Sequence, residues 1–396
     1  MAQPLFSAWK TYSITPRTLL HCAALAGQLD FSLPKYMYGC AHMNLMDKQF
    51  DVVVIGAGQA GLACGWHLKQ QGLNFILLDE QMRPGGNWRH YYDSLELFSP
   101  AVYSSLPGMP FPGTPGHYPS RDEVVCYLEQ YADQFQLPIH QGIQVKLVER
   151  AEAGFQVITA DGQRLLASAV IVASGAFSRP YLPDIPGLNK FKGSQLHSAD
   201  YRNPMPFRSR RVVVIGAANS AVQIAYDLAS VATVTLATRE AIRFAPQRIL
   251  GADFHTWLKW TGLEKTRWLN DQSTPVLDNG TYRKARRNGY FKQRPMFTKV
   301  TSTGVVWSDG RHEAVDTLLF ATGFRPNLPF LEGLPVMDVT GKVMQHDGRA
   351  SHVPGLYFVG LPKQRNFASA TLRGVGPDTG HLLPHLLHHL TDLSGI

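Results

Sequence analysis

The stretch FDVVVIGAGQAGLACGWHLKQQGLNFILLDE, residues 50–80, has the pattern of a strand, a glycine-rich turn, a helix and a second strand. Its apolar run, Val52 to Ile55, is typical of a strand buried on both faces of a parallel sheet. Glycines in the spacing G-x-G-x-x-G follow and lead into a helix. A second apolar strand then ends at Asp79, about 20 residues after Gly56, where an acid meets the ribose hydroxyls of a dinucleotide. The combination predicts a Rossmann-type unit that holds a dinucleotide, rather than a glycine-rich turn that holds nothing.

The three glycines have separate roles. Gly56 permits the tight turn, Gly58 lets the backbone approach a pyrophosphate, and Gly61 lets the helix pack closely on the strand. The helix N-terminus then faces the anion. We assign the turn and the acids after the second strand to the cofactor site: Gly56, Gly58, Gln59, Ala60, Gly61, Asp79 and Glu80.

A second, altered copy of this pattern is RVVVIGAANSAVQIAYDL, residues 211–228. Alanines replace the second and third glycines, so the backbone approach is less close, although alanine at the third position, Ala221, still allows helix packing. Polar side chains at the helix start can donate to a pyrophosphate beside the free backbone amides. The predicted contacts of this second site are Gly216, Ala218, Asn219 and Ser220.

The coenzyme preference of the second copy follows from VTLATRE, residues 234–240. Where the first copy has Asp79, this copy has Thr238 and Arg239. An arginine accommodates a 2′-phosphate that an acid would repel, so we expect NADPH to be preferred over NADH. The alternative is a surface arginine, since Glu240 stands next to it.

Composition excludes several other classes. The 396-residue chain has no apolar run of about 18 residues, so we expect no spanning helix and no membrane partner. Its formal charge of +8 is scattered apart from residues 283–294, which carry no recognition signature, so we expect no nucleic-acid partner. Its cysteines are too far apart for a zinc site or a redox dithiol, and we expect a reducing, cytoplasmic setting: Cys22, Cys40, Cys64 and Cys126.

The first 45 residues form a separate, turn-rich segment. A signal or transit peptide is one interpretation, but His21 and Cys22 interrupt its apolar centre. We favour an upstream extension without function, poorly ordered, with Met46 as the natural start.

The segment RPGGNWRHYYDSLELFSP, residues 83–100, resembles the paired-glycine segment of flavoproteins with two dinucleotide-binding domains. The resemblance implies that the first site holds FAD, with Asp79 at the adenosine ribose and Arg83 near the phosphates or in the adjoining loop. It also implies backbone beside the flavin at residues 85–86, followed by Trp88, for which core packing is the alternative. The further residues assigned to the cofactors are Gly86, Asn87, Trp88, Val145, Ala321, Gly323, Gly360 and Leu361.

Two further strands, VIVASGAFSRP (170–180) and TLLFATGFRP (317–326), end in small-residue turns. In the flavoproteins that this chain resembles, such turns mark where the chain leaves the FAD domain and returns to it. We therefore predict an α/β protein with two Rossmann-like domains, the NADPH domain inserted into the FAD domain. The expected segments are an extension (1–45), the FAD domain (46–178 and 316–396) and the NAD(P)H domain (179–315), with residues 374–378 near the isoalloxazine.

The reaction class is indicated by FKGSQLHSADY, residues 191–201. It resembles the F-x-G-x-x-x-H-x-x-x-Y signature of flavin-dependent monooxygenases, and Tyr201 resembles the N- and S-oxygenating branch. In that family the histidine segment belongs to the interdomain linker, so His197 is expected to be a structural or closure element. Disulfide reductases of similar architecture need a close cysteine pair, which this chain lacks.

One departure leaves two functions open. Classical members of the family place an asparagine beside the oxygenated flavin, whereas LFSP has Phe98 there, and a phenylalanine cannot hydrogen-bond a hydroperoxide. This variant resembles small bacterial monooxygenase-like flavoproteins, some found with arsenic or heavy-metal resistance genes, and plant auxin-forming monooxygenases. The first hypothesis is an NADPH- and O₂-using monooxygenase that passes one oxygen from a C4a-(hydro)peroxyflavin to an N, S, As or carbonyl centre. The alternative is an NADPH-dependent flavin reductase or diaphorase serving a quinone, metal ion or small protein.

The C-terminal HLLPHLLHHL, residues 381–390, places histidines at helical spacing that could ligate a metal. Pro384 suits the first turn of a helix, and no Cys, Asp or Glu stands nearby in the sequence. We therefore expect a terminal packing helix and no metal.

Overall fold

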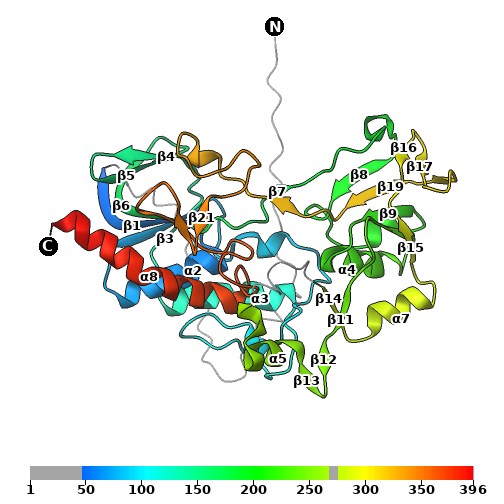
Figure 1. Ribbon diagram of the computed structural model, residues 1–396, viewed down its shortest axis with the longest axis horizontal. Helices are drawn as coiled ribbons and strands as arrows, with labels where there is room; N and C mark the ends of the chain where they lie inside the picture. The colour runs from blue at the N-terminus through cyan, green and yellow to red at the C-terminus, as the bar shows by residue number, and fades with distance from the viewer. Residues whose placement is uncertain (1–46, 267–274, 396) are drawn as a thin grey trace, which may run out of the picture. The chain divides into compact units, whose positions relative to one another are not determined.

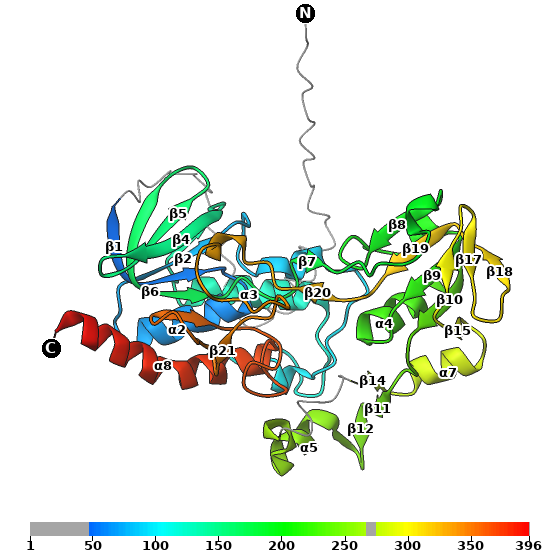
Figure 2. The ribbon, with the colours of Figure 1, turned by 45° about the horizontal axis from the view of Figure 1, so that its top comes forward.

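Two separate sheets carry the two glycine-rich turns (Figure 1, Figure 2). The computed structural model describes residues 47–266 and 275–395, and these belong to one compact unit, Met43–Ile396. The expected N-terminal extension, residues 1–45, lies outside the described residues.

The first sheet has nine strands: β1 (Lys48–Ile55), β2 (Phe75–Asp79), β3 (Ile139–Gln141), β4 (Val145–Ala151), β5 (Gly154–Thr159), β6 (Arg164–Val172), β21 (Gln345–His346), β22 (Arg349–Ala350) and β23 (Leu356–Phe358). Their order is β21-β22-β23-β6-β1-β2-β3, with the β4–β5 hairpin attached to β6. The strands from β23 to β3 are parallel. The first glycine-rich turn leaves this sheet at the carboxyl end of β1, in its parallel centre.

The second sheet has five parallel strands: β8 (Ser194–His197), β9 (Arg211–Ile215), β10 (Thr233–Thr238), β15 (Lys292–Pro295) and β19 (Thr317–Phe320). Their order is β15-β10-β9-β19-β8. Two expectations need correction here. Strand β19, which we grouped with the segment 316–396, pairs with β9 and β8 in the second sheet. His197 ends an edge strand of the same sheet and is not in a linker.

The helices cover the sheets. Helices α2 (Gln59–Gln70), α3 (Arg121–Gln134) and α8 (Leu372–Ser394) pack on the first sheet, and α4 (Asn219–Leu228) and α7 (Thr281–Arg287) pack on the second. Helix α5 (Phe254–Thr261) belongs to an excursion after β10. The remaining strands are β7 (Arg179–Pro180), β11 (Phe244–Pro246), β12 (Arg248–Ile249), β13 (Ala252–Asp253), β14 (Val276–Asp278), β16 (Lys299–Val300), β17 (Gly304–Val306), β18 (His312–Ala314) and β20 (Phe324–Arg325). Short 3₁₀ turns are η1 (Gly86–His90), η2 (Ala101–Tyr103), η3 (Leu188–Lys190), η4 (Met205–Phe207), η5 (Leu263–Lys265) and η6 (Pro329–Leu331).

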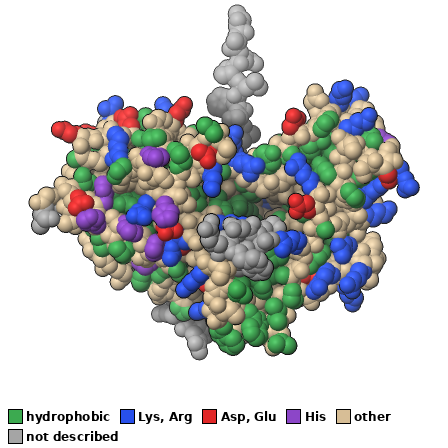
Figure 3. Space-filling model, viewed as in Figure 1, with side chains coloured by type: hydrophobic (Ala, Val, Ile, Leu, Met, Phe, Trp, Pro, Cys, Tyr) green, Lys and Arg blue, Asp and Glu red, His purple; other side chains and the backbone are tan. Residues whose placement is uncertain are grey.

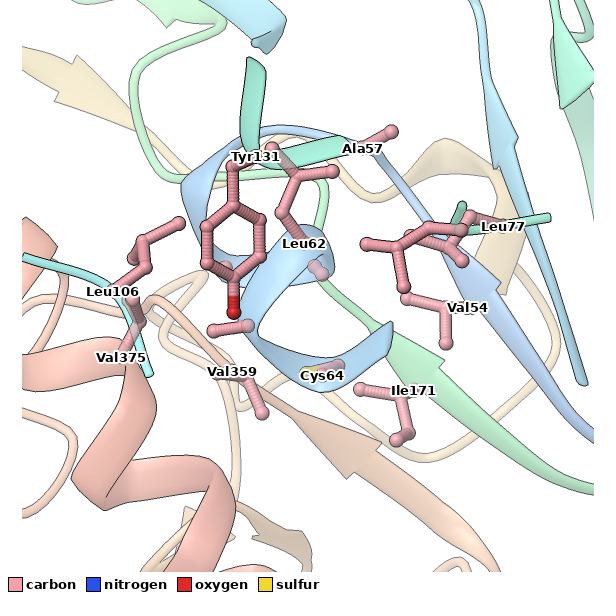
Figure 4. Packing of buried hydrophobic residues seen from close by; sticks show 14 of the residues in the cluster. Val54, Ala57, Leu62, Cys64, Leu77, Leu106, Tyr131, Ile171, Val359 and Val375 are labelled. Atoms are coloured by element: carbon pink, nitrogen blue, oxygen red, sulfur yellow. The ribbon is translucent and has the colours of Figure 1, made fainter. Parts of the chain in front are cut away.

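The apolar runs of both fingerprint strands are explained by burial on two faces. In β1, Val52 and Val54 pack toward α2, α3 and α8, whereas Val53 and Ile55 pack toward the β4–β5 side. Figure 4 shows the first of these clusters, where Val54 and Leu77 of the sheet lie near Leu62 of α2. Strand β9 alternates in the same way between α4 and the β16–β18 meander. Successive strand residues point to opposite faces, so a continuous apolar run is what a covered parallel sheet requires.

The chain crosses between the sheets twice, and the crossings are paired. Strand β7 follows the first sheet, β20 follows the second, and the two form an antiparallel ladder that lies between the sheets in Figure 2. The turns before these strands, residues 173–175 and 321–323, are the two small-residue turns predicted to mark the crossings. The α/β class with one dinucleotide-binding fold inserted in another is confirmed.

The C-terminal helix differs from expectation. Helix α8 runs through both Pro377 and Pro384, so Pro384 lies in its interior and not in a first turn. Histidine side chains gather on the surface around α8 (Figure 3). Asp347 Oδ2 lies 3.8 Å from His381 Nε2, although no acid near these histidines was expected from the sequence. Within residues 47–266 and 275–395, no three His, Cys, Asp or Glu side chains are grouped so as to hold a metal ion. No helix in these ranges combines the length and apolar character needed to cross a bilayer.

Candidate active site

The first glycine-rich turn is packed so tightly that two of its positions exclude any side chain. Gly56 has φ +104°, and a Cβ there would lie 2.6 Å from the carbonyl oxygen of Ala173. A Cβ at Gly61 would lie 1.9 Å from the carbonyl oxygen of Gly56. At Gly58 a Cβ would meet Gly86 Cα at 3.8 Å, an ordinary contact. Gly56 and Gly61 therefore serve protein packing, and Gly58 leaves the turn open toward the cavity beside it.

The helices that begin at the two fingerprints have unsatisfied N-termini. No side chain of the described residues caps α2 at Gly58 or α4 at Ala218. By contrast, α3 has a complete capping box from Ser120 and Glu123. Free N–H groups and the positive end of the helix dipole attract anions, so both helix starts fit a pyrophosphate.

A cavity of about 440 Å³ lies in front of the first turn. Its size and mixed lining are those of a ligand site. Most residues that the sequence assigned to FAD line it: Gly56, Gly58, Gln59, Ala60, Asp79, Glu80, Gly86, Asn87, Trp88, Val145 and Gly360. Three assigned residues are outside the described lining: Gly61, Arg83 and Leu361. Residues 369–372 line the cavity, whereas residues 374–378, expected near the isoalloxazine, are not among its described lining.

Asp79 is buried at the end of β2 and fastens the turn. Its Oδ2 accepts from the backbone N–H of Ala57 at 2.5 Å and its Oδ1 from that of Gln81 at 2.8 Å. Burial raises the pKa of this carboxyl, and the two backbone bonds act in the opposite direction. Each oxygen has a further lone pair, so the carboxylate can also accept from a ribose hydroxyl. The neighbouring Glu80 is exposed and lines the same cavity.

Arg83 is not among the described lining of the cavity and pairs with α3. Its Nη2 lies 2.8 Å from Glu129 Oε1 on α3, and Arg89 pairs with the same carboxylate. The two arginines tie the loop after β2 to α3. This geometry fits the adjoining-loop role and gives no support to a direct phosphate contact.

Trp88 is hydrogen-bonded to Gln59, and both residues line the first cavity. The indole Nε1 donates to Gln59 Oε1 at 3.1 Å, and Gln59 Nε2 donates to the carbonyl of Ala370 at 2.6 Å. One side chain at the start of α2 therefore links the segment after β2 to the loop before α8. Trp88 is thereby oriented at the cavity wall, and its half-buried ring also packs against the first hydrophobic cluster, so it serves both the wall and the core.

A second cavity, of about 640 Å³, lies in front of the second turn. The predicted contacts of the second site line it, as does Arg239: Gly216, Ala218, Asn219 and Ser220. The turn residues Ala321 and Gly323, which we expected where the chain returns to the FAD domain, line this second cavity and not the first, because their strand belongs to the second sheet. Arg239 and Glu240 are exposed and line it, and Arg243, which was not predicted from the sequence, lines it as well. Thr238 faces inward instead and accepts a hydrogen bond from Gln293 Nε2 at 3.3 Å.

The two cavities share a wall of five residues: Trp88, Tyr91, Leu97, Phe98 and Phe177. Four of them have no ionisable group. The fifth, Tyr91, stays protonated at neutral pH, because burial raises its pKa to about 12. Trp88 and Tyr91 meet edge to face at 5.4 Å, and Phe177 meets Phe324 in the same manner at 5.6 Å. We call these five residues the junction. The junction is an uncharged, largely aromatic wall that borders both cavities.

The monooxygenase-like signature lies beside the second cavity. Tyr201 donates to Asp227 Oδ2 of α4 at 2.7 Å, and Ser94, from the segment after β2, donates to the same oxygen at 2.9 Å. His197 is buried, accepts from Ala199 N–H through Nδ1 at 3.1 Å, and meets Phe324 edge to face. Burial lowers the pKa of His197. These contacts fasten the segment around the cavity, which fits the structural role expected for His197.

Several wall residues were not found from the sequence. Tyr91 and Phe177 carry no motif of their own; their signal was position, directly after the predicted flavin segment and after the small-residue turn. Ala370 has φ +68°, and its carbonyl receives Gln59. Its role depends on the loop folding back onto α2, which no local pattern predicts.

Comparisons with known proteins agree with this geometry. Residues 53–360 match the family described as Pyridine nucleotide-disulphide oxidoreductase. The chain belongs to this family. An uncharacterized CzcO-like oxidoreductase of Geobacillus kaustophilus (strain HTA426) is 36% identical over 87% of this chain and 100% of its own length. Indole-3-pyruvate monooxygenase YUCCA4 of Oryza sativa subsp. japonica is 28% identical over 88% of this chain and 90% of its own.

Among solved structures, a flavin-containing monooxygenase from Stenotrophomonas maltophilia superposes with a TM-score of 0.78. It is 36% identical over 86% of this chain and 99% of that chain. The protein is accordingly an oxidoreductase of the flavoprotein type with the monooxygenase fold. A cyclohexanone monooxygenase at 19% identity and a bacillithiol disulfide reductase at 16% share the fold alone.

Proposed function

We propose that the protein is an FAD-dependent, NADPH-using monooxygenase that transfers one oxygen atom from O₂ to a small, apolar-faced molecule at the junction. The observation that carries the proposal is the pair of dinucleotide-type cavities that share one uncharged wall. Hydride transfer between two cofactors, and oxygen transfer to a substrate, require the reacting groups to lie close together, and a shared wall between the two cavities allows this.

FAD fits the first cavity. The uncapped start of α2 at Gly58 would receive the pyrophosphate, Asp79 or Glu80 the adenosine ribose, and the wall at Trp88 the flavin end. When bound and reduced, FAD supplies the electrons that activate O₂. The remaining assigned residues, Gln59, Ala60, Gly86, Asn87, Val145 and Gly360, would line its path.

NADPH fits the second cavity. The uncapped start of α4 would receive its pyrophosphate, with Asn219 and Ser220 at the first positions of that helix. Arg239 and Arg243 follow the second strand of this fold, where the 2′ position of the adenosine ribose is bound in dinucleotide-binding domains. Their positive charge favours a 2′-phosphate. Glu240 beside them weakens this preference without cancelling it.

The protein's own contribution to oxygen transfer is orientation and exclusion of water. The junction side chains offer no charge to hold water, and Gln59 and Phe324 fix two of its rings. A dry site matters because exposure to water favours release of H₂O₂ over transfer of oxygen.

The alternative function is an NADPH-dependent reductase that passes electrons to a quinone, a metal ion or a small protein. Phe98 favours this alternative, since it lines both cavities and offers no hydrogen bond to oxygen. The two functions differ in whether O₂ is a required substrate.

The distinguishing experiment measures NADPH consumption by the purified holoenzyme with a panel of thioethers, amines, ketones and arsenite. A monooxygenase consumes NADPH in an O₂-dependent manner and converts a panel member in proportion. NADPH consumption that continues without O₂ when a quinone is present, and is faster with the quinone than with O₂, would favour the reductase.

A further inference from the structure

We propose that Asp253 and His255 are positioning residues that hold the ring of Phe98 in place at the junction. The positioning of Phe98 rests on the proposed function in taking the first cavity as the flavin site, and its effect on the yield of H₂O₂ rests on the proposed use of NADPH and O₂ as well. Asp253 directly precedes α5 and His255 lies in its first turn, so this helix start would hold Phe98 in the wall between the two cavities.

Asp253 is a buried carboxylate with a full set of donors. It accepts from His255 N–H at 2.7 Å and His255 Nδ1 at 2.8 Å through Oδ1. Through Oδ2 it accepts from Tyr118 Oη at 2.6 Å and from Gln247 Nε2 at 3.2 Å. Four donors satisfy an ionised carboxylate in the protein interior, where an unpaired one would be costly. The imidazole of His255 is thereby fixed along one edge.

Phe98 receives two contacts from this network. Its ring stacks on that of His255 with centroids 6.0 Å apart and planes 19° from parallel. Its backbone carbonyl accepts from Gln247 Nε2 at 2.8 Å, and the same amide nitrogen also donates to Asp253. Both ring and backbone of Phe98 therefore depend on the carboxylate of Asp253.

His255 is unlike an ordinary packing residue. It is 1% exposed, and its Nε2 has no hydrogen-bond partner among the described residues. An apolar ring would fill the same space without leaving a buried nitrogen unpaired, which costs about 1–3 kcal/mol. The imidazole, unlike an apolar ring, forms a hydrogen bond to Asp253. That bond fixes the plane of the His255 ring, on which the ring of Phe98 stacks.

The network joins segments that are far apart in the chain. Phe98 and Tyr118 come from the region before α3, and the other three members come from the excursion after β10. If the ring of Phe98 moves, water reaches the junction. NADPH, H⁺ and O₂ then yield NADP⁺ and H₂O₂, in place of NADP⁺, water and oxygenated substrate.

The first test observes Phe98 directly by ¹⁹F NMR, with 4-fluorophenylalanine incorporated at this position in the FAD-loaded protein. The wild-type background is expected to give one narrow resonance, and Asp253→Asn and His255→Ala a shifted, broadened or second one. His388→Ala, an exposed histidine on α8, is the matched control and is expected to leave the resonance unchanged. An unchanged resonance in both network variants would overturn the proposal.

His255→Phe separates stacking from positioning. It keeps an aromatic ring beside Phe98 but loses the bond to Asp253, so its resonance is expected to differ from that of wild type. A wild-type spectrum from this variant would show that stacking alone holds Phe98 and would overturn the role of Asp253.

A double-mutant cycle then tests whether His255 acts through Phe98. H₂O₂ formed per NADPH is expected to rise several-fold in His255→Ala and in Phe98→Ala, and not to rise further in the double variant. Additive effects would overturn the inference. If the wild-type enzyme oxygenates no substrate, the proposed function fails, whereas the ¹⁹F result still decides the positioning of Phe98.

Discussion

The glycines of the first fingerprint allow protein packing and cofactor binding to be separated by single methyl groups. Gly58→Ala adds a Cβ that meets the protein at an ordinary 3.8 Å, and its backbone, at φ −74° and ψ −172°, suits alanine. Gly61→Ala adds a Cβ that lies 1.9 Å from a backbone oxygen. We expect the first variant to fold normally and bind FAD weakly, and the second to lose stability.

The magnitudes follow from these distances. For Gly61→Ala, α2 must move away from β1, and such overpacking costs about 1–3 kcal/mol. For Gly58→Ala, the change at the helix start costs up to about 1 kcal/mol of stability. Holding the pyrophosphate away from one backbone N–H forfeits a hydrogen bond to a charged group, about 1.5–3 kcal/mol. That loss is about a 10- to 150-fold weaker affinity for FAD.

The assay measures thermal unfolding of FAD-free protein and FAD affinity by titration of that protein. Comparison of the FAD-free forms matters because bound ligand raises apparent stability. Gly58→Trp, which fills the approach entirely, is expected to abolish FAD binding. Wild-type affinity in Gly58→Ala together with stoichiometric FAD in Gly58→Trp would refute the placement of the pyrophosphate at this turn.

Three further predictions concern other parts of the molecule. Arg239→Ala is expected to raise the KM for NADPH by about ten-fold, the effect of about 1.4 kcal/mol, and to change that for NADH little; equal changes would contradict the phosphate assignment. Cys64 is buried and its pKa is raised by burial to about 12, so iodoacetamide at pH 8 should label it only after unfolding, as peptide mass mapping would reveal; labelling of native protein would contradict this. Burial opposes ionisation of Asp253, but hydrogen bonds from His255 and Tyr118 outweigh it and lower its pKa, so its stabilisation is present above about pH 4, the unfolded value, and is lost as pH falls through the lower folded value. Asp253→Asn should therefore unfold at a lower temperature than wild type at pH 7, with the gap closing in acid; a gap that is constant with pH would show that ionisation is irrelevant.

The fold was predictable because both fingerprints are local. The apolar run and glycine spacing of residues 52–61 specify a covered strand, a tight turn and a close helix without knowledge of distant residues. The same is true of β9 and α4. Strand β19 was grouped with the wrong sheet because its burial on both faces suits either sheet, and pairing with β9 depends on the tertiary arrangement.

The cofactor sites were predictable where the chain itself forms the cradle, as at Gly58 and Ala218. They were not predictable where a distant segment closes the wall. Arg83 suggested a phosphate contact from its position, but Glu129 of α3 provides a partner that the sequence did not indicate. From the sequence, Phe98 could be recognised only as a residue that cannot hydrogen-bond a hydroperoxide. Its stacking on His255 could not be predicted, because the two residues are more than 150 positions apart in the chain.

The fate of molecular oxygen distinguishes oxygen transfer to a substrate from simple reduction of O₂. The holoenzyme is supplied with NADPH and ¹⁸O₂ and with the panel member that most stimulates O₂ uptake, and the product is analysed by mass spectrometry beside the yield of H₂O₂. The proposed function predicts that each product molecule carries one ¹⁸O atom. It also predicts that the amount of this product equals the NADPH consumed minus the H₂O₂ formed. Product without ¹⁸O, or NADPH accounted for entirely by H₂O₂ and reduced acceptor, would contradict it.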